Sequence, residues 1–172
     1  LRLDYVERKQ VEHKFEMDHK FEEIFNLIES KDINPSKGIF FDGQIFDAYK
    51  FISDLIRNAK KSIILIDNFV DDSVLTLFSK RDKDVKVKIF TKISKQLELD
   101  LKKYNSQYVL ITIEEFTKSH DRFIIIDDKV YHFGASLKDL GKKWFAFSRF
   151  DKEAVKLLNK LKKLDSDKKQ IK

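Results

Sequence analysis

A histidine, a cation and a carboxylate stand at fixed spacing in one apolar segment of the chain. Residues 120–127 read HDRFIIID, so His120 precedes Arg122 by two positions and Asp127 by seven. Side chains two apart on a β-strand point to the same face, which predicts that His120 and Arg122 project together beside the end of a sheet. An imidazole can attack phosphorus or protonate a leaving oxygen, a cation can bind the non-bridging oxygens, and a carboxylate can orient the site. The segment therefore indicates phosphate binding or phosphodiester chemistry.

The same segment resembles the signature of the phospholipase D superfamily, His-x-Lys-x4-Asp, followed about six residues later by a Gly-Ser-x-x-Asn element. His120, Arg122 and Asp127 occupy its three positions, and residues 134–139, which read GASLKD, follow at the expected distance. The resemblance covers roughly residues 38–150. It implies an α/β sandwich, with a central, mostly parallel mixed sheet flanked by helices. It also implies that His120 is the nucleophile of a covalent phospho-enzyme and that a second His, from another copy, protonates the leaving group.

Two positions depart from this signature. Arg122 stands in place of Lys; it keeps the charge and can hold phosphate in a bidentate manner, but its bulk moves the donors outward. Ala135 and Ser136 stand where Gly-Ser is expected, and Asp139 stands where Asn is expected. A charge on Asp139 would repel phosphate, unless it pairs with Arg122 or Lys138. We therefore expect phosphate binding to survive these changes better than catalysis.

Further residues near the motif are candidates for phosphate or nucleic-acid contact. We predict phosphate binding by Arg122, Ser136 and Lys138, although Ser136 could equally close a turn or cap a helix. Asp127 could likewise begin a hairpin turn. Residues 142–145 read KKWF, a combination that can lay a nucleic-acid strand against the site, although a solvated turn before a core strand explains it equally well. The predicted nucleic-acid contacts are Lys118, Lys142 and Lys143.

Metal chemistry has weaker support in the sequence. Asp84 and Lys86, with Asp71 or Asp72 upstream, imitate a metal-dependent nuclease pattern, but such a pattern arises readily in a chain with 37% charged residues. Three other histidines have no partners at zinc-ligand spacing: His13, His19 and His132. We predict neither a metal ion nor a cofactor.

Strand and helix patterns alternate through the segment that leads to the motif. Helices are expected at residues 48–58 with Asp47 as the cap, at 72–78 with Asp71 or Asp72 as the cap, and at 94–104. Strands are expected at residues 62–66, 85–90, 108–113, 122–126, 130–133 and 144–147, before a closing helix at 155–164. This order of elements predicts an α/β sandwich.

Three regions are expected along the chain. Residues 1–37 would form a helical linker or stalk, in which Phe21, Ile24, Phe25 and Ile28 recur at helical spacing. Residues 38–164 would form the phospholipase D-like domain, and residues 165–172 a frayed basic tail. Because the first residue is Leu1 rather than Met, we expect a fragment of a longer DNA-associated protein.

Composition limits the function classes. The net charge of +6 favours polyanion binding, and the excess lies after residue 37. No apolar run reaches the length of a membrane span and Cys is absent, so we expect a cytoplasmic protein without membrane partners. One motif per chain implies, by the resemblance, a homodimer. We predict a dimeric domain that binds nucleic acid, DNA over RNA; the alternatives are a metal-independent nuclease or phosphodiesterase acting through His120, and a purely structural dimerisation domain.

Overall fold

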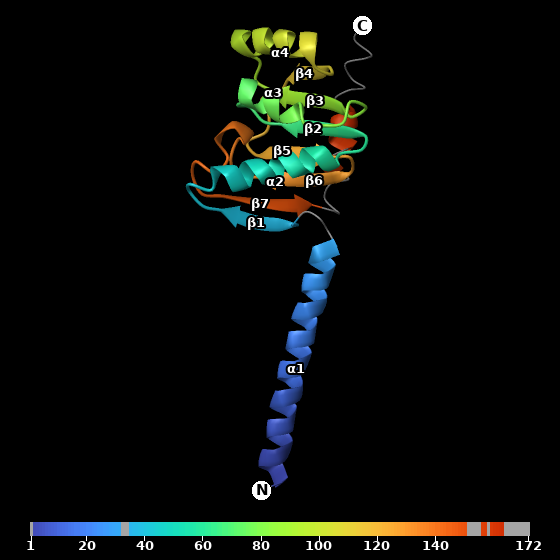
Figure 1. Cartoon of the computed structure of the whole chain (residues 1–172), viewed down its shortest axis with the longest axis vertical. Coiled ribbons are helices and arrows are strands. Elements are labelled where there is room, and N and C mark those ends of the chain that lie inside the picture. The colour runs from blue at the N-terminus through green and yellow to red at the C-terminus, as the bar shows by residue number, and fades with distance from the viewer. Residues whose placement is uncertain (1, 32–34, 151–155, 158, 164–172) are drawn as a thin grey trace. The chain divides into compact units, whose positions relative to one another are not determined.

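The structure is a computed structural model that describes residues 2–31, 35–150, 156–157 and 159–163 (Figure 1). The chain divides into two compact units, Leu1–Pro35 and Ser36–Lys172. The first unit contains α1 (Arg2–Lys31), a single helix of 30 residues. The side chains of residues 22–31 lie outside the description, and so does the predicted pairing through Ile24, Phe25 and Ile28. No helix in the described ranges is long and apolar enough to cross a bilayer.

One seven-stranded sheet forms the centre of the second unit, with the strand order β1-β7-β6-β5-β2-β3-β4 (Figure 1). Its strands are β1 (Lys37–Phe40), β2 (Ser62–Ile66), β3 (Lys86–Thr91), β4 (Ile111–Glu115), β5 (Arg122–Ile126), β6 (Lys129–Phe133) and β7 (Phe145–Phe150). Two predicted strands, residues 62–66 and 122–126, are recovered with the predicted ends, and the other four are recovered with shifted ends. The short edge strand β1 is an addition that the sequence patterns did not indicate.

The direction of the strands corrects one part of the predicted fold. The α/β class and the mixed sheet flanked by helices are confirmed, but the sheet is not mostly parallel. Only the pairs β2–β3 and β3–β4 are parallel, whereas the other four pairs of the described sheet are antiparallel. For one of these pairs the connection sets the direction: β5 and β6 are joined by the two residues Asp127 and Asp128, and a connection of that length permits only antiparallel pairing.

Three helices connect the first four strands, β1 to β4: α2 (Ile45–Asn58), α3 (Asp72–Phe78) and α4 (Lys95–Gln107). Of the two predicted caps of α3, Asp71 is the one that caps it: its carboxylate accepts a hydrogen bond from the Ser73 N–H at 3.1 Å, whereas Asp72 is the first residue of the helix. The predicted cap of α2 is wrong. This helix begins two residues before Asp47, which therefore lies in the first turn, where its charge favours the positive end of the helix.

Two apolar clusters hold these layers together, one on each face of the sheet. Ile52 and Ile56 of α2 pack with Ile124 of β5 and with Phe133 of β6, and in Figure 1 α2 runs across these strands. On the other face, Leu161 from the helical residues 159–163 packs against side chains that include Ile66, Phe90 and Ile125. Because β5 is covered on both faces, its first residue, Arg122, has a fixed backbone position, and the loop that ends at Asp121 is attached to it.

Candidate functional site

The strand directions bring the loops that carry His120, Ser136 and Lys142 to one edge of the sheet, where the strands end or begin. We call it the motif edge; it comprises residues 41–44, 67–71, 92–94, 116–121 and 134–144. These loops follow the ends of β1, β2, β3, β4 and β6 and precede β5 and β7. The opposite edge, which we call the Asp127 edge, comprises residues 59–61, 79–85, 108–110 and 127–128.

The two ends of the motif fall on different edges. Arg122 is the first residue of β5 and lies at the motif edge, whereas Asp127 follows the last residue of β5 and lies at the other end. The Asp127 carboxylate accepts hydrogen bonds from the backbone N–H groups of Lys60, Lys61 and Ser62, with shortest N–O distances of 3.0, 2.7 and 3.0 Å. The structure therefore brings Arg122 together with the loop of His120, but not with Asp127.

The electrostatics of Asp127 agree with its role as an anchor. Partial burial raises the pKa of its carboxyl group, but the backbone hydrogen bonds from Ser62, Lys60 and Lys61 outweigh burial and hold the pKa below its usual value. Its φ of 58° lies in the left-handed region, which Asp tolerates better than most residues. Asp127 thus closes the β5–β6 turn and ties it to the start of β2.

His120 lies in a bend before β5 and is exposed. It is therefore not a strand residue, and the two-residue periodicity that predicted its direction does not apply to it. Its loop is nevertheless held at both ends. The Asn68 side chain donates to the carbonyl of Ser119 at 2.9 Å, and the N–H of Phe116 donates to the carbonyl of Thr91, also at 2.9 Å. The imidazole has no hydrogen-bond partner among the described residues.

A hollow of about 540 Å³ opens beside Arg122 at the motif edge. It is lined by Phe69, Arg122, Gly134, Ala135, Ser136, Lys138, Asp139, Lys142, Lys143 and Trp144. Five of the residues predicted for phosphate or nucleic-acid contact thus share one surface: Arg122, Ser136, Lys138, Lys142 and Lys143. Lys118 and His120 belong to the neighbouring β4–β5 loop and are not part of this lining.

The charge of the hollow is predominantly positive. The Arg122 guanidinium and the Lys138 ammonium group lie 5.7 Å and 5.9 Å from the centre of the Phe69 ring, within the range of cation–π attraction. Asp139 pairs with Lys142 at 2.9 Å, and not with the two residues considered from the sequence. The lining therefore has four cations and one carboxylate, and Arg122 has no carboxylate partner among the described residues.

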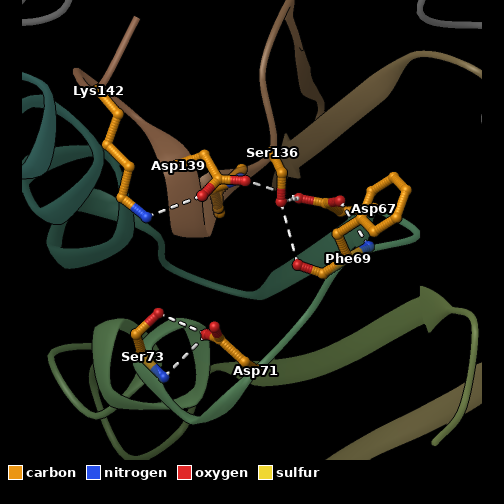
Figure 2. A network of polar contacts seen from close by, with 8 residues as sticks. Asp67, Phe69, Asp71, Ser73, Ser136, Asp139 and Lys142 are labelled. Atoms are coloured by element: carbon orange, nitrogen blue, oxygen red, sulfur yellow. Dashed lines mark hydrogen bonds and ion pairs between the residues drawn. The ribbon is translucent and has the colours of Figure 1, made fainter.

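A buried carboxylate is hydrogen-bonded to the loop that lines the hollow, and Figure 2 shows its network of polar contacts. Asp67, which is 1% exposed, accepts hydrogen bonds from the Ser136 hydroxyl at 2.8 Å, the Leu137 N–H at 2.9 Å and the Phe69 N–H at 3.0 Å. The Ser136 oxygen also lies 3.1 Å from the Phe69 carbonyl, and its single proton can serve only one of these acceptors at a time. Ser136 therefore fixes the loop that carries Lys138.

Sequence reasoning missed Asp67. One signal was available: Asp67 directly follows the strand Ser62–Ile66, which reads as buried on both faces. A carboxylate at the end of such a strand is expected to be buried too, and therefore to need hydrogen-bond donors. A carboxylate that is 99% buried needs several donors, and the structure supplies them from two loops. Asp67 is thus a positioning residue for the motif edge.

The metal-dependent alternative is not supported by the geometry. Asp71 and Asp72 follow β2 at the motif edge, whereas Asp84 and Lys86 lie at the start of the parallel strand β3, at the Asp127 edge. No group of three or more His, Asp or Glu side chains that could hold a metal ion occurs in the part of the chain that the structure describes. His132 lies on β6, with its Nε2 atom 3.5 Å from the Asp121 carboxylate.

The sheet and its helices define a phospholipase D-like fold. NucT from Helicobacter pylori is similar, with a TM-score of 0.54 and 16% identity over 74% of this chain and 93% of that one. The archaeal chromatin protein TrmBL2 has a TM-score of 0.51 and 16% identity over 93% of this chain and 65% of its own. Phosphatidylserine synthase from Haemophilus influenzae Rd KW20 also has a TM-score of 0.51 and 16% identity, over 70% of this chain and 35% of its own. No protein-family model and no curated protein matches the sequence.

Proposed function

We propose that this domain binds the phosphodiester backbone of nucleic acid, DNA in preference to RNA, at the hollow beside Arg122. The observation that carries the proposal is the collection of four cations around one hollow with a single carboxylate, which already pairs with Lys142. Arg122 has donors that match two phosphate oxygens at once. TrmBL2, whose fold is similar, is a chromatin protein that binds DNA, which supports the same ligand class for this domain.

The proposed binding would be electrostatic in origin and therefore sensitive to salt. Each cation that neutralises a phosphate releases condensed counterions, so the affinity falls as the salt concentration rises. Arg122 is half-buried at the start of β5, so its backbone is fixed while its charge remains within reach of a ligand. Lys143, which is exposed, would contribute a more mobile contact.

We also propose that two chains act together as a homodimer. One motif per chain supplies one His120, whereas the chemistry that the phospholipase D resemblance implies requires one His to attack and another to protonate the leaving oxygen. Two-fold pairing is the commonest closed symmetry, and it would bring two hollows into one groove. Light scattering at high micromolar concentration tests this: a dimer supports a shared groove, and a monomer would remove it.

A second candidate function is phosphodiester hydrolysis without a metal ion. It is favoured by His120, which is exposed on a loop that Asn68 holds in place. In the reaction, the imidazole of one chain would form a bond to phosphorus while the bond to the leaving oxygen breaks. The His120 of the second chain would give that oxygen a proton, and water would then release the phosphate from the first imidazole.

One assay separates the candidate functions. Single-stranded and duplex DNA are incubated with the full chain in the presence of a chelator at pH 5 to 8, and cleavage and binding are measured in parallel. Salt-sensitive binding without cleavage at any pH supports the binding domain, whereas cleavage that His120→Ala abolishes supports the enzyme. If neither binding at low salt nor cleavage is found, both candidates fail and a structural dimerisation domain remains.

Arg122→Lys sharpens the same assay, because it restores the cation of the family signature. A gain of cleavage would identify a weakened enzyme. Loss of affinity without cleavage would identify a phosphate clamp adapted to Arg, because Lys cannot hold two phosphate oxygens in a planar arrangement.

A cytoplasmic location stays a prediction.

A further inference from the structure

We propose that Trp144 is a stacking platform for an unpaired nucleobase, so that the hollow at the motif edge takes single-stranded nucleic acid. This inference rests on the proposed function and extends it from the phosphate backbone to the bases. Trp144 is exposed, so the packing of the sheet does not account for it, and binding of the phosphate backbone by the cations does not need it.

Trp144 is exposed and yet held in one orientation. Its side chain is 68% exposed, although the next residue, Phe145, is the first residue of β7 and is buried. The indole meets the Phe41 ring edge to face, with centroids 4.8 Å apart and an angle of 87° between the planes. The indole N–H donates to the carboxylate of Asp42. Because an edge-to-face contact covers at most one face of the indole and Trp144 is largely exposed, we infer that the other face is open to a ligand.

The turn that holds Trp144 is itself fixed. The N–H of Gly43 donates to the carbonyl of Gly141 at 3.1 Å, and the N–H of Phe41 donates to the Gln44 side chain at 2.7 Å. Gly141 has a φ of +76°, and a Cβ atom there would lie 2.5 Å from the Cα of Ile45. Only glycine therefore allows the loop of residues 137–144 to approach the start of α2 so closely.

The arrangement is costly for a surface that binds nothing. Leaving a large aromatic side chain in water forgoes the favourable free energy of burial, and holding it still forgoes rotamer entropy as well. Both losses are offset when a flat apolar ligand stacks on the open face. A nucleobase is such a ligand, and stacking on aromatic side chains is a recurrent way to bind single strands.

The charges beside Trp144 select nucleic acid over an apolar partner. Trp144 lines the same hollow as Arg122, Lys138 and Lys143, so a ligand on its open face needs anionic groups next to a planar one. A single-stranded nucleic acid combines the two features. Bases inside a duplex are paired and stacked on one another, and they offer no free face to an indole.

The chain contains one tryptophan, so its fluorescence reports on Trp144 alone. The experiment titrates the full chain at low salt with three labelled probes of equal length: an oligothymidylate, the same backbone with abasic sites, and a duplex. Binding is followed by the anisotropy of the label, and stacking by quenching of the indole emission. We expect the oligothymidylate to bind roughly fivefold or more tightly than the abasic strand, and to be the probe that quenches the emission most.

Two variants complete the test. Trp144→Ala should weaken binding of the oligothymidylate by roughly fivefold or more and leave binding of the abasic strand unchanged. Trp144→Phe should retain most of the affinity, because the flat ring is kept. Tyr108→Ala is the matched control, since Tyr108 is an aromatic residue, 47% exposed, at the Asp127 edge, and its removal should leave all three affinities within twofold.

The outcomes distinguish failure of base stacking on Trp144 from failure of backbone binding at the hollow. Equal binding of the normal and abasic strands without quenching would overturn the platform while leaving the backbone-binding proposal intact. Tighter binding of the duplex than of the single strand would also overturn the platform. If none of the three probes binds at low salt, the proposed function fails, and the stacking role of Trp144 fails with it.

Discussion

The two ends of β5 carry polar side chains of opposite charge, and their surroundings differ. At one end, the Asp127 carboxylate is surrounded by backbone N–H groups of Lys60, Lys61 and Ser62, so its hydrogen-bonding capacity serves the fold. At the other end, Arg122 has an aromatic neighbour, Phe69, but no carboxylate partner among the described residues. The hydrogen bonds of Asp127 stabilise the sheet, whereas the charge of Arg122 is not neutralised by a carboxylate of the described residues. Two residues five positions apart in the sequence thus have different surroundings.

Asp67 sharpens this comparison, because it is a carboxylate with several hydrogen-bond donors at the motif edge. Asp67→Ala should lower the free energy of unfolding by about 3 kcal/mol, since the buried donors on Ser136 and Leu137 lose their acceptor. Denaturant unfolding followed by circular dichroism measures the change. Asp67→Asn is the matched variant: it keeps one acceptor oxygen and should lose less. An unchanged unfolding midpoint in Asp67→Ala would contradict the role assigned to this network.

Asp127 provides the second largest effect. Asp127→Ala removes the acceptor for the three backbone N–H groups and places Ala in the left-handed region, so the free energy of unfolding should fall by about 2 kcal/mol. Nucleic-acid affinity, measured on the folded variant below its unfolding temperature, should stay within twofold of the parent. A loss of affinity as large as the one caused by changing Arg122 would show that the two ends are not separate.

The pH dependence of stability tests the same anchor through the charge of its carboxylate. The pKa of Asp127 is lower in the folded state than in the unfolded state, because the backbone hydrogen bonds outweigh burial. Its contribution is therefore fully present above the unfolded-state pKa of about 4 and is lost as the pH falls through the folded pKa. The stability difference between the parent and Asp127→Asn should be largest near neutral pH and shrink as the pH falls from the unfolded-state pKa through the lower folded-state pKa. A difference that grows on acidification would contradict this sign.

The sequence predicted the individual elements of the fold better than their directions. The strand at Ser62–Ile66 is clear because four of its five residues are apolar and adjacent. The start of the helix after it is clear to within one residue, because Asp71 and Asp72 are both suited to cap the first N–H groups of a helix. Strand direction depends on connection length, and the two-residue turn at Asp127 and Asp128 makes β6 antiparallel to β5. The edge strand β1 escaped notice because four residues carry too little pattern.

The candidate site was predicted where it is contiguous in the sequence and missed where it is assembled by the fold. The spacing around His120 and Arg122 and the later KKWF segment indicated residues that the structure places at one edge. The hydrogen bonds of Asp67 to Ser136 and of Asn68 to Ser119 span 69 and 51 positions, and no local pattern encodes such pairs. The prediction that Asp127 shares in the chemistry stays a prediction, and its contacts are those of an anchor.

Asp139 gives the smallest expected effect. It holds Lys142 in an exposed ion pair, which contributes at most about 1 kcal/mol to stability. Asp139→Asn should leave unfolding nearly unchanged and tighten nucleic-acid binding by about two- to fivefold at low salt, because one carboxylate leaves the hollow. Isothermal titration with an oligonucleotide measures the gain. Weaker binding after this change would show that Asp139 takes part in binding rather than limiting it.

The most direct measurement compares the loss of one charge at each end of β5. Arg122→Gln and Lys60→Gln each remove one positive charge, and the exposed Lys60 keeps its backbone hydrogen bond to Asp127. The oligonucleotide affinity of both variants is measured from about 50 to 200 mM salt. Arg122→Gln should weaken binding by about tenfold and lower the slope of log K against log salt concentration by nearly one, whereas Lys60→Gln should change neither by more than about twofold. Equal losses in the two variants would mean that net charge alone attracts the nucleic acid, and the hollow beside Arg122 would lose its claim to be the binding site.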